Sequence, residues 1–236
     1  QRYIVVVNGK AHTIFTHRCR SRHCQNCQKI KAYIWQEKMK EIIPELTLNF
    51  KNGKYLFITF TVKNPKIKNL RLVLLCMSRA YAKMFQRKDF RHVVGGIRST
   101  EITRGKSGSD EAHPHFHAII CLKTTYFKKE NYLTADEWGG HWGECLKSEF
   151  QKEGLEYNEK DYPKGFPRVD IRVAKSADGK TEITNKNIAE NGEQLINYVL
   201  KYSIKGSDLL KDGKADEWFF EFDKQVKGIR MIAPVG

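Results

Sequence analysis

The apolar positions along the chain recur at two spacings, and these spacings predict its secondary structure. Apolar residues at every second position, or in short aromatic and β-branched runs, predict strands, whereas steps of three and four predict amphipathic helices. Strands are expected at 55–62, 92–104, 114–122 and 168–174. Helices are expected at 28–43, 65–84, 134–150 and 193–204. Pro44 and Gly206 mark the expected ends of the first and last helices.

From residue 46 onward, the predicted elements follow the order strand, helix, strand, strand, helix, strand, helix. This is the order of a split βαβ, or ferredoxin-like, unit with one further helix. It predicts an α+β domain over 46–236, with an antiparallel sheet and its helices packed on one side. Residues 1–45 form a separate basic, cysteine-rich segment with its own helix. Residues 176–187 are expected to be a loop or small hairpin, and the tail around Trp218 to cover the core.

The balance of charges narrows the possible partners. The 236 residues include 42 lysines and arginines against 27 aspartates and glutamates, a formal net charge of +15. Because lysine and arginine gain affinity by releasing counterions from phosphates, we expect a nucleic acid partner. Arg18, Arg20 and Arg22 are the candidate DNA-binding residues, since no acidic residue precedes Glu37. A solvated basic surface on an ordinary soluble protein is the alternative.

The apolar runs and the cysteine content predict a cytoplasmic chain without a membrane partner. No run approaches the roughly 20 apolar residues that span a bilayer. Six cysteines in 236 residues are too few for a secreted disulfide scaffold, so a reducing host cytoplasm is expected. Cys76 and Cys121 lie in apolar surroundings that are typical of buried thiols.

Three of the cysteines are clustered near the N-terminus. Cys19, Cys24 and Cys27 have the spacing C-x4-C-x2-C, and His17 precedes the first of them by two residues. Thiolates at such short spacings commonly share a tetrahedral Zn²⁺, so these four residues predict a structural zinc site. His23 is a substitute for the fourth ligand, and three free surface thiols are the alternative to zinc binding.

Residues 113–117, with the sequence His-Pro-His-Phe-His, are the strongest candidate for a catalytic metal site. Side chains alternate along a strand, so His113, His115 and His117 project from one face and Phe116 from the other. Imidazoles spaced by two residues are well placed to share one ion. The alternative is a solvent-facing histidine ridge, but the apolar residues that follow indicate a buried strand.

Glu101 on the preceding predicted strand is the candidate third ligand. If the connecting loop is centred near Ser109, Glu101 lies opposite His117 and diagonal to His115. Two histidines and a carboxylate suit Mn²⁺ or Mg²⁺ with positions left open for phosphate oxygens. His113 is the alternative third ligand. A salt bridge from Glu101 to a neighbouring arginine, Arg98 or Arg104, is the alternative to metal binding.

Residues 198–202 place Tyr198 and Tyr202 one helical turn apart, on the same face of the last predicted helix. Aromatic residues at this spacing are commonly core residues. After a metal-binding strand, however, they suggest a nucleophile that attacks a phosphate and forms a 5′-phosphotyrosine. The reference pKa of tyrosine is about 10. The metal and a nearby lysine, for which Lys201 is the candidate, would therefore have to stabilise the developing charge.

Taken together, these residues resemble the motifs of HUH endonucleases. Residues 113–117 resemble the histidine–hydrophobic–histidine motif, 57–61 the first motif and 198–202 the tyrosine motif. The chain is most similar to replication initiator (Rep) proteins of small rolling-circle plasmids, over most of residues 17–205. Further shared features are the cysteine cluster, the aromatic segment 126–127, the tryptophans Trp138 and Trp142, and the short strand 169–172.

The resemblance implies an HUH nuclease domain over 46–236, with its catalytic helix near 193–205. His115 and His117 would bind the metal, and Tyr202 would be the first nucleophile in nicking and rejoining single-stranded DNA. Many plasmid Rep proteins carry glutamate where this chain has Tyr198. The chain is therefore similar to the two-tyrosine branch, which includes phage initiators and some transposases, and the plasmid, phage or transposon context stays open.

The implied partner is single-stranded or hairpin DNA at a replication origin, with a host helicase as a further candidate partner. A transposase or relaxase with the same chemistry is one alternative. A zinc-containing nucleic-acid-binding module without catalysis is another. A third is a metal-dependent hydrolase that uses water and has structural tyrosines, and this alternative predicts a cleaved product without a covalent adduct.

Overall fold

The computed structural model describes residues 2–7, 10–16, 24–105, 110–200, 209–210 and 214–235. The helices are α1 (Gln25–Asn49), α2 (Leu70–Phe85), α3 (Ala135–Lys152), α4 (Ile188–Leu200) and α5 (Glu217–Val226). Four short 3-10 helices are η1 (Ile67–Asn69), η2 (Lys88–Phe90), η3 (Thr124–Phe127) and η4 (Glu159–Asp161). The strands are β1 (Arg2–Val7), β2 (Lys10–Thr16), β3 (Lys54–Phe60), β4 (Val93–Arg104), β5 (Ala112–Leu122), β6 (Val169–Val173) and β7 (Ile232–Val235).

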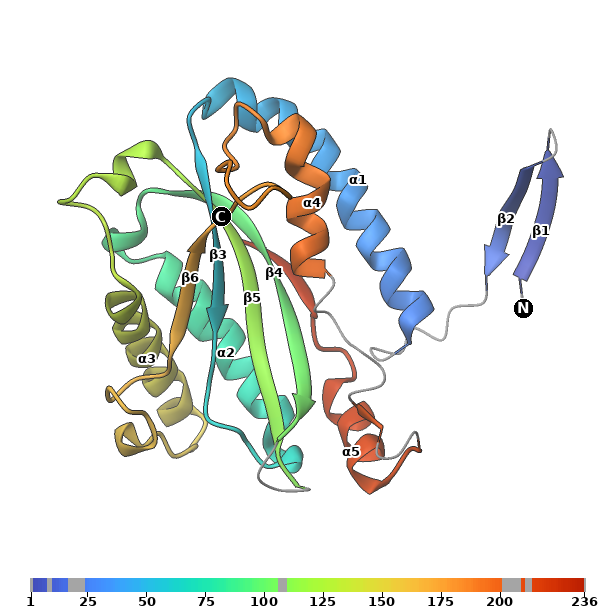
Figure 1. The fold of residues 1–236 in the computed structure, drawn as a ribbon. Helices are drawn as coiled ribbons and strands as arrows, with labels where there is room; N and C mark the ends of the chain where they lie inside the picture. The colour runs from blue at the N-terminus through green and yellow to red at the C-terminus, as the bar shows by residue number, and fades with distance from the viewer. Residues whose placement is uncertain are drawn as a thin grey trace.

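A five-stranded sheet with the order β6-β3-β5-β4-β7 forms the centre of the molecule (Figure 1). Every neighbouring pair in it is antiparallel. Its first four strands have the spatial order of a split βαβ unit, because β5 lies between β3 and β4, which α2 connects. The predicted α+β class and antiparallel sheet are confirmed, as are all four strands expected from the apolar pattern.

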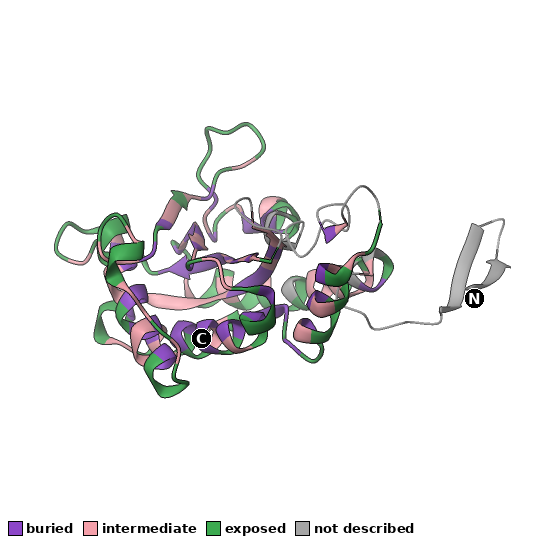
Figure 2. Cartoon of the chain, turned by 90° about the horizontal axis from the view of Figure 1, so that it is seen from below, coloured by how far each residue is buried: buried purple, intermediate pink, exposed green. Residues whose placement is uncertain are grey.

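One face of the sheet packs against α2, α3 and α5. Phe60 and Phe116 from the sheet, Met77 from α2 and Trp138 from α3 are all within 1% of full burial in this core. Trp142 is also fully buried, and its indole N–H donates a 2.7 Å hydrogen bond to the carbonyl of residue 61. Figure 2 shows the buried residues running through the interior, with exposed residues on the outer sides of the helices. The two tryptophans therefore have a structural role.

The opposite face of the sheet is also covered, so the expectation of helices on one side is wrong. Ile188 and Leu195 of α4 belong to a second buried cluster with Ile97 of β4 and Ile119 of β5. The helix α1 packs alongside α4 (Figure 1). The physical reason is the apolar run at the end of β5, where both the odd and the even positions are buried. Such a run is typical of a strand that is buried on both faces.

The N-terminal part differs from the expectation in the end of its helix and in an additional hairpin. The helix α1 continues through Pro44 to Asn49, because tertiary contacts hold its last turns. The side-chain amide of Asn185 donates hydrogen bonds to the carbonyls of Leu46 and Phe50 and so fixes this end of the helix. Before α1, β1 and β2 form a separate antiparallel hairpin that the apolar pattern did not predict.

The segment after α4 covers the core as expected, and it also adds a helix and a fifth strand to the sheet. It contains α5, whose Trp218 and Phe222 are buried, and β7, which extends the sheet by pairing with β4. Cys76 and Cys121 are buried as predicted. Among the helices within the described ranges, none is both long enough and apolar enough to cross a membrane.

Candidate metal centre

The alternation of β4 and β5 brings Glu101, His115 and His117 together on the face of the sheet that α4 covers in part. One ligand atom from each of the three lies within 4.8 Å of the others. The alternation is visible in the burial of β5, where Phe116 is buried in the core and the flanking histidines are half-buried. The same face is closed further along the strand by α4, over Ile119. The three side chains thus lie beside a covered, apolar part of the sheet.

The pairing of the two strands differs by two residues from the expected one. Glu101 lies opposite His115, and Ser99 lies opposite His117. A slip of two residues leaves every side chain on the same face, so the apolar pattern does not distinguish the two pairings. The third ligand is therefore directly opposite His115 and diagonal to His117, the reverse of the expectation.

His117 is held at both ring nitrogens. Its Nε2 lies 2.7 Å from a carboxylate oxygen of Glu101, and its Nδ1 lies 3.1 Å from the hydroxyl oxygen of Thr59. Thr59 belongs to β3 and pairs with His117 across the strands. Sequence reasoning did not single out this threonine for a role, because its neighbour is 58 residues away along the chain and only the strand pairing brings them together.

His115 has the properties of a neutral metal ligand. Its Nδ1 is buried, and no hydrogen-bonding group in the described part of the chain contacts it. Burial, and secondarily the neighbouring His113 and His117, lower the pKa of His115 to about 4, although Glu101 opposes the shift. The imidazole is therefore neutral near pH 7, which is the form that binds metals.

The alternatives for Glu101 and His113 are decided by their neighbours. His113 contacts the ring of His115, and its Nδ1 shares a hydrogen bond with the side-chain oxygen of Asn64. It is not part of the cluster of possible ligands, so Glu101 is the better third ligand. Neither candidate salt bridge of Glu101 fits, because Arg104 pairs with Asp216 and Arg98 lies on the opposite face of the sheet.

These donors fit a divalent cation. Two imidazoles and one carboxylate leave further coordination positions for oxygen atoms, and such mixed nitrogen and oxygen sets suit Mn²⁺ or Mg²⁺. The orphaned nitrogen of buried His115 also favours a bound ion, because a buried polar atom without a partner is costly. Thr59 would then orient one of the ligands from behind, as hydrogen-bonding neighbours of metal-binding histidines commonly do.

The helix α4, whose last described residues begin the predicted tyrosine motif, packs on the face of the sheet that carries Glu101, His115 and His117. Its backbone includes Tyr198 in the last turn, and Leu195, three residues earlier, is buried on the sheet. Asn185, which is 1% exposed, precedes α4 and accepts a hydrogen bond from the Tyr55 hydroxyl of β3. No pattern in the polar segment 176–187 marked this asparagine. Lys201 and Tyr202 lie outside the described residues.

The N-terminal predictions are only partly within the described chain. Cys24 caps the start of α1, and Cys27 is buried in its first turn. The other predicted zinc ligands, His17 and Cys19, and the substitute His23 lie outside the described residues, as do the predicted DNA-binding residues Arg18, Arg20 and Arg22.

Residues 11–236 match the family described as "Replication protein". The chain belongs to this Rep family. The match confirms the resemblance to Rep proteins that the histidine and tyrosine motifs suggested. It covers the whole sheet domain, including α5 and β7, which no motif had marked.

Curated relatives named "Protein rep" come from several organisms. A "Protein rep" of Lentilactobacillus hilgardii is 29% identical over 236 residues, which is 98% of this chain and 68% of the relative. A "Protein rep" of a Bacillus species is 30% identical over 89% of this chain and 64% of its own length. A third, of Streptococcus pneumoniae, is 27% identical over 74% of this chain and 50% of its own length. The chain thus spans about half to two thirds of these relatives. No solved structure matches it significantly.

Proposed function

We propose that this Rep protein initiates rolling-circle replication by nicking and rejoining single-stranded DNA through a covalent 5′-phosphotyrosine. The observation that carries the proposal is the cluster of Glu101, His115 and His117 on the sheet face that α4 covers in part. The family match supports the replication role over a transposase or a relaxase, since the relatives are replication proteins.

In this proposal, Glu101 of β4 and His115 and His117 of β5 hold Mn²⁺ or Mg²⁺. When bound, the ion supplies Lewis acidity that withdraws charge from the scissile phosphate. The neutral state of His115 keeps a nitrogen lone pair available for binding near pH 7. The hydroxyl of Thr59 keeps the ring of His117 in one orientation. The carboxylate of Glu101 adds the negative charge that favours a hard cation.

The proposed nucleophile is Tyr202, four residues beyond Tyr198 in the sequence. Its hydroxyl oxygen attacks the phosphorus, the new oxygen–phosphorus bond forms, and the bond to the 3′ oxygen breaks. The proton lost by the tyrosine balances the one gained by the departing 3′-OH. Lys201 is the proposed source of positive charge beside the reacting phosphate. Because no water is consumed, an incoming 3′-OH can reverse the reaction, and Tyr198 can cut a second strand while the first stays attached.

The proposal also includes a DNA substrate and a role for the N-terminal segment in binding it. Single-stranded or hairpin DNA at a replication origin is the proposed substrate, and a host helicase the proposed protein partner. A structural Zn²⁺ held by Cys24, Cys27, Cys19 and His17 would fix the segment before α1 and present Arg18, Arg20 and Arg22 to the DNA. The position of Cys24 and Cys27 one turn apart at the start of α1 supports such a site.

The test is incubation with labelled single-stranded oligonucleotides that carry a cognate origin, in Mn²⁺, followed by a denaturing gel. We expect a labelled protein–DNA adduct that disappears on adding a chelator and in Tyr202→Phe. The variant Tyr198→Phe should keep the first nick and lose mainly the second transfer. Cleaved DNA without an adduct would instead show a water-using hydrolase.

A matched pair of histidine variants separates the metal centre from general damage to the fold. His117→Asn should abolish the adduct. His141→Asn should retain it, because His141 lies on α3 and packs against Phe90, in the layer on the other face of the sheet. Retained nicking by His117→Asn would contradict the proposed metal centre. DNA binding without any nicking under these conditions would favour a non-catalytic binding module.

A further inference from the structure

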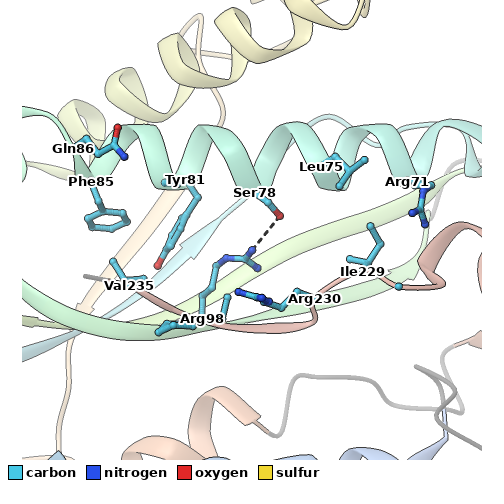
Figure 3. Close-up of a pocket in the computed structure, with 14 residues that line it drawn as sticks. Arg71, Leu75, Ser78, Tyr81, Phe85, Gln86, Arg98, Ile229, Arg230 and Val235 are labelled. Carbon is cyan, nitrogen blue, oxygen red and sulfur yellow. Dashed lines mark hydrogen bonds between the residues drawn. The ribbon is translucent and has the colours of Figure 1, made fainter.

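A second polar site lies on the other face of the sheet from the metal centre. A cavity of about 590 Å³, open on one side to solvent, lies between α2 and the segment 228–235, which leads into β7 (Figure 3). Arg98 reaches it from β4 and lies on the face opposite to Glu101, because the two residues are an odd number of positions apart on one strand. The cavity is therefore separated from the metal centre by the sheet itself.

The guanidinium of Arg98 is buried without a carboxylate. The residue is 4% exposed, and its N–H groups donate to the hydroxyls of Ser78 at 3.0 Å and Thr100 at 3.1 Å. Its flat side lies 3.9 Å above the ring of Phe116. Within the described ranges, no acidic side chain forms an ion pair with Arg98, and none lines the cavity. A buried charge of this kind is costly unless an opposite charge compensates it.

Further donors point to the same space. Arg230, which is exposed, and Arg71 also line the cavity, so three arginines surround it. The hydroxyl of Tyr81 is buried, and no hydrogen-bonding group of the described chain contacts it. Figure 3 shows Tyr81, Arg98 and Arg230 directed from α2, β4 and the C-terminal segment toward one another. Among the described residues, the arrangement offers hydrogen-bond donors and positive charge but no carboxylate to compensate them.

We propose that this cavity binds the phosphate group of a nucleotide, held by Arg98, Arg230 and the hydroxyl of Tyr81. A phosphate presents three oxygens, which match two guanidinium groups and one hydroxyl better than the two oxygens of a carboxylate do. The volume exceeds the need of a bare anion. The apolar side chains of Leu75 and Phe85 line the remaining space and fit a sugar or a base.

The nucleotide can be a free one or part of a DNA strand, since both offer the same phosphate. The inference does not depend on the tyrosine chemistry or on the metal, because none of these residues belongs to the metal centre. It can therefore be tested in a chelator, where failure of nicking has no influence on the result.

The first experiment is calorimetric titration of the intact chain in EDTA with deoxyadenosine monophosphate, deoxyadenosine and a thymidine hexanucleotide. We expect the monophosphate or the hexanucleotide to bind and deoxyadenosine, which lacks the phosphate, to bind at least about tenfold more weakly. Binding of the monophosphate identifies a free nucleotide as a ligand. Binding of the hexanucleotide alone identifies a DNA strand. Equal binding of monophosphate and nucleoside, or no binding of any probe, overturns the inference.

Two variants locate the binding. Arg230→Gln removes an exposed charge and should lower the affinity for the phosphate-bearing probe about tenfold, because hydrogen bonds to charged groups are the strong ones. Arg91→Gln is the matched control, since Arg91 is an exposed arginine outside the cavity that bonds to Asn131. Equal affinities of the two variants would overturn the site.

Tyr81→Phe distinguishes a binding role from a structural one. Without ligand, the variant should unfold at a higher temperature than the wild type, because it removes a buried hydroxyl that lacks a partner. With the phosphate-bearing probe, it should bind about fivefold or more weakly, because one of the proposed donors is lost. A variant that is less stable without ligand and binds as tightly as the wild type would contradict the role of Tyr81.

Discussion

The imidazole of His117 touches two different side chains, and each contact has a separate consequence for the metal centre. The contact with Glu101 joins two proposed ligands of one ion. The contact with Thr59 lies at the other ring nitrogen and reaches the strand behind the histidine. Such hydrogen bonds fix the tautomer and the orientation of a ligand before the metal arrives. The hydroxyl of Thr59, which would not itself coordinate the ion, can thus change the affinity of the site for the metal.

We therefore expect Thr59→Val to weaken Mn²⁺ binding. The change keeps the shape of the side chain and removes the hydroxyl, and loss of such an outer partner costs about 10- to 100-fold in metal affinity. Thr61→Val is the matched control, because the hydroxyl of Thr61 donates a hydrogen bond to the carbonyl of Arg168 and does not contact a proposed ligand. Calorimetric titration with Mn²⁺ measures both, and equal affinities would contradict the positioning role.

The depressed pKa of His115 predicts how the stability of the metal-free chain depends on pH. The ordinary pKa of about 6.5 applies in the unfolded chain, whereas burial lowers the folded value to about 4. The unfolded chain therefore binds more protons between these values, and the folded state loses stability as the pH falls from about 6.5 to 4. The full shift is worth about 3 kcal/mol.

Urea unfolding in EDTA at several pH values measures this contribution. We expect His115→Asn to lose less stability than the wild type between pH 7 and 5, because it has no imidazole to protonate on unfolding at this position. If the two proteins lose stability in parallel over this range, the histidine is not held neutral by burial in the folded state.

The strands and helices are packed so closely that single glycines matter where two elements meet. In α3, Gly139 faces the segment after η4, and a Cβ added there would lie 2.7 Å from the ring of Phe166. Its neighbour Gly140 has no atom of the described chain within 4 Å of the corresponding position. The two glycines share one helix and differ in what they face.

This difference predicts opposite effects of the same substitution. Gly140→Ala should raise the free energy of unfolding by about 1 kcal/mol, which is the difference in helix propensity between the two residues. Gly139→Ala should lower it by about 1 to 3 kcal/mol, because overpacking outweighs that gain. Chemical denaturation of both variants measures the effect, and a stabilised Gly139→Ala would show that α3 can move away from Phe166.

The helix α4 is held at its start and along its buried side. Asn185 connects that start to β3 through Tyr55 and to α1 through the carbonyls of Leu46 and Phe50. Two turns further, Leu195 is buried on the sheet. These contacts fix the described part of α4 on the sheet through packing with segments that are distant in the sequence, since no local property of the helix could set its position.

The central sheet separates the two sites for which a phosphate ligand is proposed. The face with Glu101 and His117 carries the metal centre, and the face with Arg98 carries the proposed phosphate cavity. Around both, the chain has 42 basic against 27 acidic residues, so the net charge of +15 attracts a polyanion to the whole surface. A charge of this size would attract the proposed DNA substrate before any specific contact forms.

Binding of single-stranded DNA should therefore depend steeply on salt. We expect the association constant to fall at least about tenfold between 50 and 200 mM salt, because each phosphate contact releases condensed counterions. Fluorescence anisotropy with a labelled oligonucleotide, in EDTA so that nicking does not interfere, measures the slope. A flat response would contradict a binding mode dominated by phosphate contacts.

Local patterns were sufficient for the four central strands and for the residues of the candidate metal cluster. The alternation along 113–117 places three histidines on one face whatever the rest of the chain does, because successive side chains of any strand point to opposite sides. The apolar steps of three and four residues likewise predicted α2, α3 and α4. The bounds of α3 agree within two residues, whereas α2 begins five residues after its expected start and α4 five residues before. The order of the elements indicated the split βαβ sheet, because few topologies are compatible with it.

Local patterns were not sufficient for relations between distant parts of the chain. The pairing of β4 with β5 was expected two residues away from its observed position, since a slip of two exposes and buries the same residues. The layer of α1 and α4 on the second face, the passage of α1 through Pro44 and the edge strand β7 depend on contacts with segments far away in sequence. The bond from Thr59 to His117 and the burial of Arg98 without a carboxylate arise in the same way, because both depend on which strands and helices meet in the folded chain.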